Sequence, residues 1–306
     1  MTKTNRLVEP LSLAHGPAWK NRFMLAPLTN LQSHEDGRLS DDEFRWLTMR
    51  AEGGFGLTMT CAAHVQAGGQ GFPGQLGIWD DRHLEGLTRL AAAIKTRGSV
   101  SSVQLHHAGI RSPKELVGEV VGASDDADTG ARAMTTAEVE AARDAFIAAA
   151  KRAEKAGFDG VEVHGAHGYL LAQFLSAETN RRSDAYGGSL ENRARLTFEI
   201  VDGIRAACGP DFQLGIRLSP ERFGLKLAEV IDVASELLGK AKIDFLDMSL
   251  WDVNKEPAEE EFQGKSLMEY FTSLPRGQVR LGAAGKIMSG ADAAAVIDAG
   301  CDFAVI

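Results

Sequence analysis

The stretch TAEVEAARDAFIAAAKRAEKAGFDGVEVH, residues 136–164, decides the fold, because it carries a helix and a strand in direct succession. Apolar residues recur with a helical period over 136–156, a threonine N-cap precedes Glu138 in the first turn, and Gly157 follows the last turn. The next segment, 159–164, is short and apolar, as a buried parallel strand is. We therefore expect parallel strands joined by crossover helices.

The same alternation extends over the whole chain. Strand candidates lie at 22–26, 56–61, 100–105, 159–164, 212–218, 243–249, 278–283 and 301–306. Helix candidates lie at 40–52, 81–97, 136–156, 190–207, 227–240, 265–273 and 290–299. Eight strands alternating with helices predict an α/β fold, the (β/α)8 TIM barrel, for which about 250 residues are typical. The extra length lies in three segments after strand ends, on the face where barrels carry active sites: 62–79, 106–134 and 251–264.

The chain ends at Ile306, inside or just after the eighth strand candidate. We therefore expect residues 1–306 to form a single barrel domain that is truncated at its C-terminus and lacks the final helix. The sequence alone does not show whether such a barrel closes.

Composition narrows the class of protein. The 306 residues are 44% hydrophobic and 25% charged, and the formal net charge is −9. A negative chain is a poor ligand for nucleic acid or anionic membranes, so we expect neither partner but a small-molecule substrate. Three dispersed cysteines offer no disulfide framework, and no signal peptide or run of about 18 apolar residues occurs. We therefore predict a cytoplasmic protein.

The segment after the fourth strand candidate carries the strongest chemical signal. His164 and His167 stand three residues apart at the strand end, where two imidazoles can donate hydrogen bonds to one substrate oxygen. Tyr169 follows and could supply a proton from its hydroxyl. Two alternatives remain open: these are ordinary loop or core histidines, or Glu162 joins them as a metal ligand. We expect no metal.

Two further features predict an anionic ligand. Arg217 lies inside the otherwise apolar LGIRLSP, where a buried cation needs either a bound anion or electron-rich ring, or a strand carboxylate in an internal salt bridge. Gly285 begins a turn beside Lys286 after the seventh strand candidate, the usual place for a phosphate in barrels. No GxGxxG follows a strand, so a separate dinucleotide domain is not supported.

Taken together, these motifs resemble the Old Yellow Enzyme family of flavin-dependent ene-reductases, in its form with two histidines. The resemblance runs from about residue 19 to the end and rests on KNRFMLAPLTN, VQLHHAG, GFDGVEVHGAHGYLLAQFL with TNRRSDAYGGSLENRAR, LGIRLSP and LGAAGKI. It implies a barrel with non-covalent FMN across its C-terminal mouth. The family usually continues past the eighth strand with a Gly-Arg that holds the phosphate, and Ile110 and Cys61 stand where members often have Arg and Glu.

The resemblance also assigns the site residues. It implies flavin contacts from Pro27, Leu28, Thr29, Ala62, Gln104, Arg217, Gly285 and Lys286. It implies that His164 and His167 hold the carbonyl or nitro oxygen of an activated alkene while Tyr169 protonates the α-carbon.

The expected function is therefore reduction of the C=C bond of α,β-unsaturated carbonyl or nitro compounds by NAD(P)H, with FMN and ping-pong kinetics. The family suggests a homo-oligomer. Two alternatives stay open: the barrel of a larger iron–sulfur dienoyl-CoA reductase or amine-dehydrogenase-like enzyme, and an inactive truncated barrel.

Overall fold

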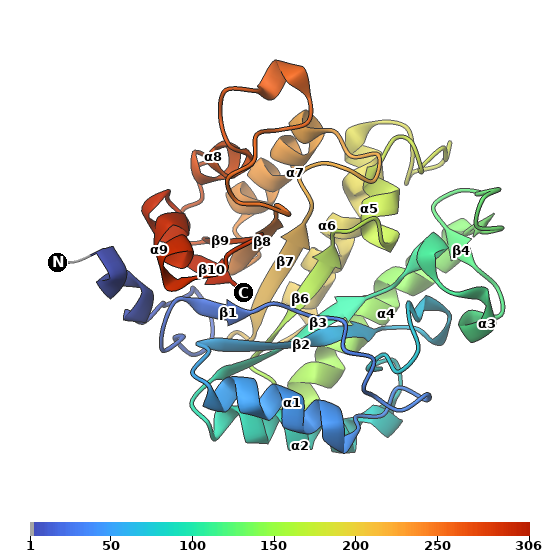
Figure 1. Ribbon diagram of the computed structural model, residues 1–306. Coiled ribbons are helices and arrows are strands. Elements are labelled where there is room, and N and C mark those ends of the chain that lie inside the picture. The colour runs from blue at the N-terminus through green and yellow to red at the C-terminus, as the bar shows by residue number, and fades with distance from the viewer. Residues whose placement is uncertain (1–2) are drawn as a thin grey trace.

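Eight parallel strands close into a barrel in the computed structural model, which describes residues 3–306 (Figure 1). The strands are β1 (Phe23–Leu25), β2 (Leu57–His64), β3 (Val100–His106), β6 (Gly160–Gly165), β7 (Gln213–Leu218), β8 (Phe245–Ser249), β9 (Arg280–Ala284) and β10 (Phe303–Val305). All eight coincide with predicted segments. Met24 of β1 pairs with Val305 of β10, so the last strand closes the barrel.

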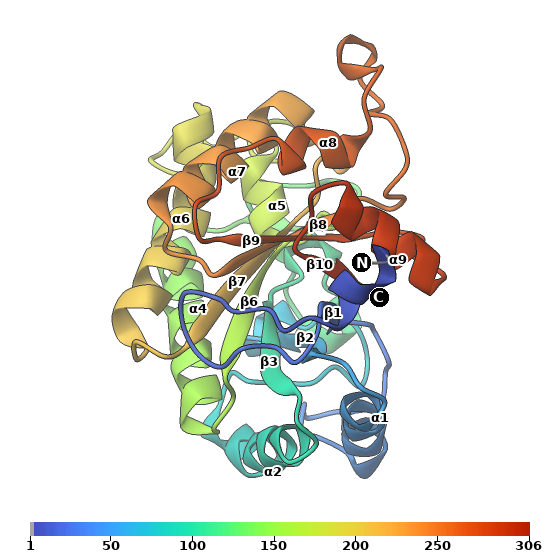
Figure 2. The ribbon, with the colours of Figure 1, turned by 90° about the vertical axis from the view of Figure 1, so that its left-hand side faces the viewer.

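The helices lie outside the strands (Figures 1 and 2). All seven predicted helices are present: α1 (Asp41–Glu52), α2 (Leu84–Lys95), α4 (Thr136–Lys155), α6 (Leu190–Ala207), α7 (Leu227–Lys240), α8 (Leu267–Thr272) and α9 (Gly290–Asp298). Thr135 is the N-cap of α4 and forms a capping box with Glu138. Within the described residues, no helix is long and apolar enough to cross a membrane.

Two short α-helices and two short β-strands were not predicted. They are the helices α3 (Lys114–Val117) and α5 (Leu170–Leu175), and the two strands β4 (Val121–Gly122) and β5 (Arg132–Ala133), which pair with each other outside the barrel. Three of them lie in the segment 106–134 and the fourth follows the histidine pair, so they shape the loops on the C-terminal side of the strands.

An apolar plug fills the N-terminal end of the barrel. Leu11 and Trp19 pair in an antiparallel bridge, and the Trp19 ring packs edge-on against Phe245 and Phe303 at centroid distances of 5.6 and 4.9 Å. Its indole nitrogen donates a hydrogen bond of 3.1 Å to Gln213 Oε1. Because this end is packed, a ligand has access only from the carboxyl ends of the strands.

Candidate active site

Four neighbouring strands bring predicted site residues into register. Ala62 of β2 lies opposite Gln104 of β3, Gln104 lies opposite Glu162 of β6, and His164 of β6 lies opposite Arg217 of β7. All five side chains are buried. The sequence spacing therefore places these polar groups side by side under the mouth of the barrel.

Four aromatic rings meet just above this layer. The His164 ring centroid lies 5.0 Å from that of His167 and 5.2 Å from that of Tyr169, and His106 packs against Tyr169 at 4.4 Å. The chain turns after the strand end through two consecutive left-handed residues, His167 (φ 61°) and Gly168 (φ 69°). This turn returns His167 and Tyr169 toward the strand end that carries His164.

These histidines are neutral near pH 7. Burial lowers the pKa of His164 and His106 well below the usual value, and the neighbouring His, Arg111 and other cationic groups lower it further. Burial, with the charges of Arg217 and Arg111, lowers the pKa of His167 to about 3. Each ring is therefore a neutral imidazole that can donate one N–H to a substrate oxygen without carrying a charge.

Hydrogen bonds hold His167 in place from three directions. Its backbone N–H donates to Ser219 Oγ at 3.0 Å, its Nε2 lies 2.8 Å from Ser249 Oγ, and Arg111 donates to its carbonyl oxygen. The sequence analysis missed Ser249 and Arg111. In the sequence, only their places in the chain point to the site: Ser249 ends the sixth barrel strand, and Arg111 lies near the start of the long segment after the third.

A compact group of buried charges lies beneath the rings. Arg217 Nε lies 3.1 Å from Asp247 Oδ2, and Gln104 Nε2 donates a hydrogen bond of 2.8 Å to Glu162 Oε1. The strand carboxylate considered for Arg217 is therefore present. Burial raises the pKa of Glu162, the negative charge of Asp247 raises it further, and Arg217 opposes the rise.

Several polar atoms of this group have no hydrogen-bond partner among the described residues. They are Arg217 Nε, Glu162 Oε2, His164 Nδ1 and both carboxylate oxygens of Asp247. Buried polar atoms are normally hydrogen-bonded, so unpaired ones at the mouth of a barrel indicate a ligand site. The described residues contain no group of three or more His, Cys, Asp or Glu that could hold a metal ion, so the reading of Glu162 as a metal ligand gains no support.

The remaining predicted residues lie at the rim. Pro27 is half-buried, Leu28 and Thr29 after β1 are exposed, and Leu28 is 48% exposed in spite of its apolar side chain. Gly285 after β9 has φ of 149°, and a Cβ there would approach Asp252 N to 2.7 Å, so the turn requires glycine. Lys286 is exposed, and its Nζ lies 3.2 Å from Asp252 Oδ2.

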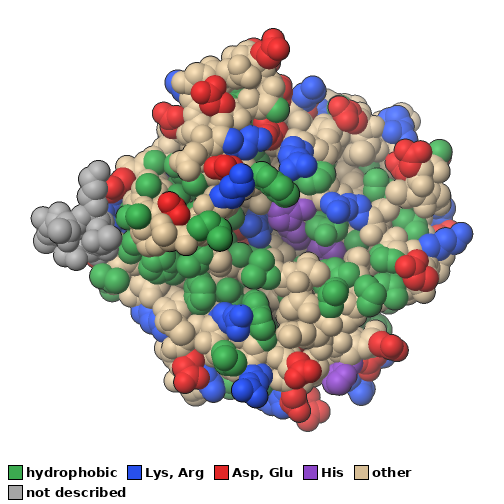
Figure 3. Space-filling view, viewed as in Figure 1, with side chains coloured by type: hydrophobic (Ala, Val, Ile, Leu, Met, Phe, Trp, Pro, Cys, Tyr) green, Lys and Arg blue, Asp and Glu red, His purple; other side chains and the backbone are tan. Residues whose placement is uncertain are grey.

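A cavity of about 410 Å³ opens beside His167, Tyr169 and Ser249. In Figure 3 histidine side chains form the floor of a hollow on this face of the molecule, and lysine and arginine side chains gather around it. The loops after β3, β7 and β8 provide the walls.

Comparison with known proteins agrees with this architecture. Residues 6–302 match the model of the NADH:flavin oxidoreductase / NADH oxidase family, and the chain is 41% identical over 310 residues to the probable NADH-dependent flavin oxidoreductase YqiG of Bacillus subtilis, covering 97% of this chain and 83% of the relative. The chain belongs to the Old Yellow Enzyme family. A solved Old Yellow Enzyme homologue from Zymomonas mobilis superposes with a TM-score of 0.85 at 28% identity, covering 98% of this chain and 88% of that chain.

A solved 2-naphthoyl-CoA reductase is also similar, with a TM-score of 0.88 at 29% identity; the match covers 99% of this chain but 50% of that one. Old Yellow Enzyme relatives are oxidoreductases that bind FMN, with NAD(P)H as the reductant. This protein is therefore an FMN-dependent NAD(P)H oxidoreductase, which confirms the fold, the family and the cofactor expected from the sequence.

The barrel mouth fits the flavin of an Old Yellow Enzyme. Arg217 Nε and His164 Nδ1 are buried polar atoms with no hydrogen bond among the described residues, as expected where the polar edge of a bound ring completes the site. The Gly285 turn leaves no room for a side chain beside Asp252. The residues present therefore agree with the cofactor that the family uses.

Proposed function

We propose that this protein reduces the C=C bond of α,β-unsaturated carbonyl or nitro compounds with NAD(P)H by a ping-pong mechanism. The observation that supports the proposal most is the pair of neutral imidazoles, His164 and His167, with ring centroids 5.0 Å apart beside Tyr169. Bound FMN would supply the hydride that it receives from NAD(P)H.

The chain's own residues would prepare the alkene for that hydride. Both imidazoles would donate N–H to the carbonyl or nitro oxygen, where negative charge develops, and this withdraws electrons from the β-carbon. Tyr169 would give its hydroxyl proton to the α-carbon. Because the rings are neutral, they stabilise the developing charge without transferring a proton to the oxygen.

The same proposal assigns the residues that hold FMN. Arg217 would stand near the part of the ring that gathers negative charge on reduction, Gln104 would face its pyrimidine edge, and Ala62 would lie against it. Pro27, Leu28 and Thr29 would line one side. Gly285 and Lys286 would hold the phosphate, with Lys286 shared between the phosphate and Asp252.

The test is an absorption spectrum of the purified chain with added FMN, first under anaerobic NADPH and then with 2-cyclohexenone. We expect flavin bands that bleach with NADPH and return with the enone. Bands that bleach but do not return with any enone or nitroalkene would refute the proposed substrate class while leaving the flavin site intact. A chain that takes up no FMN would refute the assigned cofactor residues.

A second candidate is the barrel domain of a larger reductase. It is favoured by the 50% coverage of the 2-naphthoyl-CoA reductase chain. The same experiment separates the two, because steady turnover of a simple enone by this chain alone needs no further domain.

A further inference from the structure

The cavity beside the histidine pair has two arginines at its mouth. Arg111 comes from the loop after β3 and Arg222 from the loop after β7, and both line the cavity and are exposed. Arg111 lies over the Tyr169 ring at 4.8 Å, and Arg222 lies over the Trp251 ring at 4.8 Å. Phe223 lies within 6 Å of both guanidinium groups.

Neither arginine has a carboxylate partner within the part of the chain that the structure describes. The Arg111 guanidinium donates to the carbonyl oxygen of His167, and the Arg222 guanidinium lies against the rings of Phe223 and Trp251. Glu221 is the one carboxylate that lines the cavity, and it is buried and paired with Lys255. The mouth therefore carries excess positive charge.

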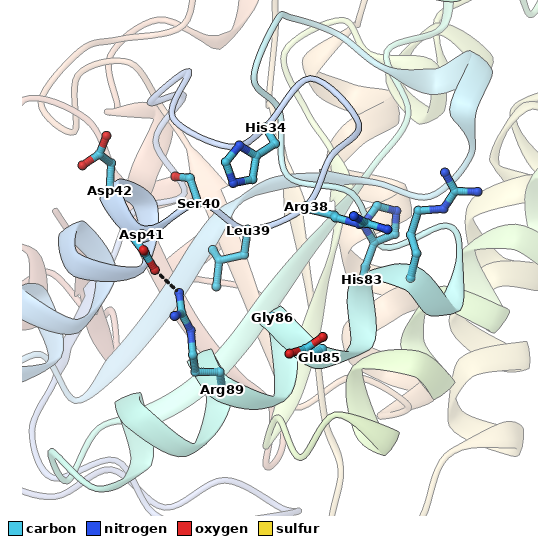
Figure 4. Close-up of a pocket in the computed structure, with 11 residues that line it drawn as sticks. His34, Arg38, Leu39, Ser40, Asp41, Asp42, His83, Glu85, Gly86 and Arg89 are labelled. Atoms are coloured by element: carbon cyan, nitrogen blue, oxygen red, sulfur yellow. Dashed lines mark hydrogen bonds and ion pairs between the residues drawn. The ribbon is translucent and has the colours of Figure 1, made fainter.

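Arginines in the second large cavity are arranged differently (Figure 4). That cavity, of about 660 Å³, lies between the start of α1 and α2, and its Arg89 forms an ion pair with Asp41 at 2.7 Å. Arg82 pairs with Asp80 at 3.0 Å. The arginines of the second cavity are therefore paired with carboxylates, whereas the two at the cavity beside the reacting groups are stacked on aromatic rings and lack such partners among the described residues.

The backbone around Arg222 is held in an unusual conformation. Arg222 has φ of 69°, Phe223 has φ of 55° and Trp251 has φ of 66°, all in the left-handed region that side chains rarely adopt. Trp251 is 67% exposed. Strained backbone that presents exposed aromatic and cationic side chains to a cavity is typical of a ligand clamp.

We propose that Arg111 and Arg222 bind a carboxylate or phosphate carried by the ligand, next to the double bond that His164 and His167 activate. This inference rests on the proposed function and narrows it to anionic substrates. A guanidinium can bind a carboxylate or a phosphate through two parallel hydrogen bonds. Trp251 and Phe223 would cover the apolar part of the same molecule. The anion has two sources, an acidic electron acceptor or the phosphates of NAD(P)H.

The experiment compares trans-4-oxo-2-pentenoate with its methyl ester, which share the alkene and the ketone and differ in the charge. We expect the FMN-loaded protein to prefer the acid. Arg222→Gln should lower kcat/KM for the acid by about tenfold, the size of one lost charge-assisted hydrogen bond, and change that for the ester less than twofold. Arg111→Gln also removes the hydrogen bond to the His167 carbonyl, so it should lower kcat/KM for both compounds, and more for the acid. Arg89→Gln, in the other cavity, is the matched control and should change neither.

Rapid-mixing measurements of flavin reduction by NADPH distinguish the two sources. If the arginines bind the dinucleotide, Arg222→Gln raises the apparent Kd for NADPH and leaves the ratio of acid to ester unchanged. Unchanged acid, ester and NADPH kinetics in both variants would overturn the proposal. If the proposed function is wrong, the wild-type protein turns over neither compound. In that case, titration of the flavin absorption with the acid measures anion binding directly.

Discussion

Arg217 Nε lies 3.1 Å from Asp247 Oδ2 on neighbouring barrel strands, and although both groups are buried, neither atom makes a hydrogen bond within residues 3–306. The pair is held by charge alone, at the place where the cofactor is expected. Buried polar atoms are normally hydrogen-bonded, so these two atoms indicate that a ligand binds beside them.

The first prediction concerns Asp247→Asn. Removing one partner of a buried ion pair leaves an uncompensated charge, so the free energy of unfolding should fall by about 3–5 kcal/mol without FMN. Urea unfolding with and without FMN is the measurement, and bound flavin should restore part of the loss. Asp41→Asn, in the exposed pair with Arg89, should cost no more than about 1 kcal/mol. Equal losses in both variants would contradict this account.

The second prediction concerns the histidine pair. Replacing both His164 and His167 by Ala should weaken binding of phenols and lower kcat/KM for enones by about 100-fold or more, because two donors to one oxygen are lost. Flavin reduction by NADPH and the FMN content should change far less. Titration of the flavin absorption with p-hydroxybenzaldehyde measures the binding, and unchanged affinity would refute the assigned role.

The third prediction concerns the proton donor. Tyr169→Phe keeps the ring contacts with His106 and His164 and removes only the hydroxyl. The rate of enone reduction should fall by about 10²–10⁴, the usual size of a general-acid contribution, while the rate of NADPH oxidation in the first half-reaction stays the same. Transient kinetics of the two half-reactions check this. Equal rates for the enone in both proteins would assign the proton to another donor.

Most of the fold could be predicted from the sequence. Strands buried on both faces have continuous apolar runs, and capped helices such as α4 have clear ends, so all eight strands and seven helices were found. The short α5 was missed because six residues, all buried, show no amphipathic period. The strands β1 and β10 were predicted, but their pairing was not, because each has only three residues and the sequence shows no feature that fixes which strand the last one joins.

The candidate site was only partly predictable. Residues with a fixed distance from a strand end, such as His164 and Arg217, follow from the barrel register. Ser249 reaches the cavity from the end of β8, and Arg111 and Arg222 reach it from the loops after β3 and β7. Their positions depend on left-handed turns and tertiary packing that no spacing reveals. The partner of Arg217 was considered as a strand carboxylate, but only the register of β7 with β8 identifies it as Asp247.

The fourth prediction concerns acid stability. Burial lowers the pKa of His64, His83 and His107 to about 4, whereas an unfolded histidine titrates near 6.5. The unfolded chain therefore binds more protons below pH 6.5, and the free energy of unfolding should fall as the pH drops from about 6.5 to about 4. Each such histidine contributes about 1.4 kcal/mol per pH unit in that window.

Urea unfolding between pH 7 and 5 measures this slope. His83→Leu should reduce it by about one proton, because both ring nitrogens of His83 are buried without hydrogen-bond partners among the described residues. The exposed His34→Gln is the matched control and should leave the slope unchanged. A slope that is the same in all three proteins would show that His83 is not held neutral by the fold.

The last prediction concerns the turn assigned to the phosphate. Gly285 has φ of 149°, and a Cβ would lie 2.7 Å from Asp252 N and from the carbonyl carbon of Trp251, so Gly285→Ala forces the turn away from the loop after β8. Because Lys286 pairs with Asp252 across the same contact, its ammonium should move with the turn.

FMN affinity, measured by fluorescence quenching, should fall at least tenfold, whereas riboflavin, which lacks the phosphate, should bind about equally to both proteins. Gly290→Ala, at the first residue of α9 with open space around its Cβ, should keep FMN affinity and change the free energy of unfolding by less than about 1 kcal/mol. Parallel losses for FMN and riboflavin would place the damage at the ring instead of the phosphate, and would remove Gly285 from the phosphate site.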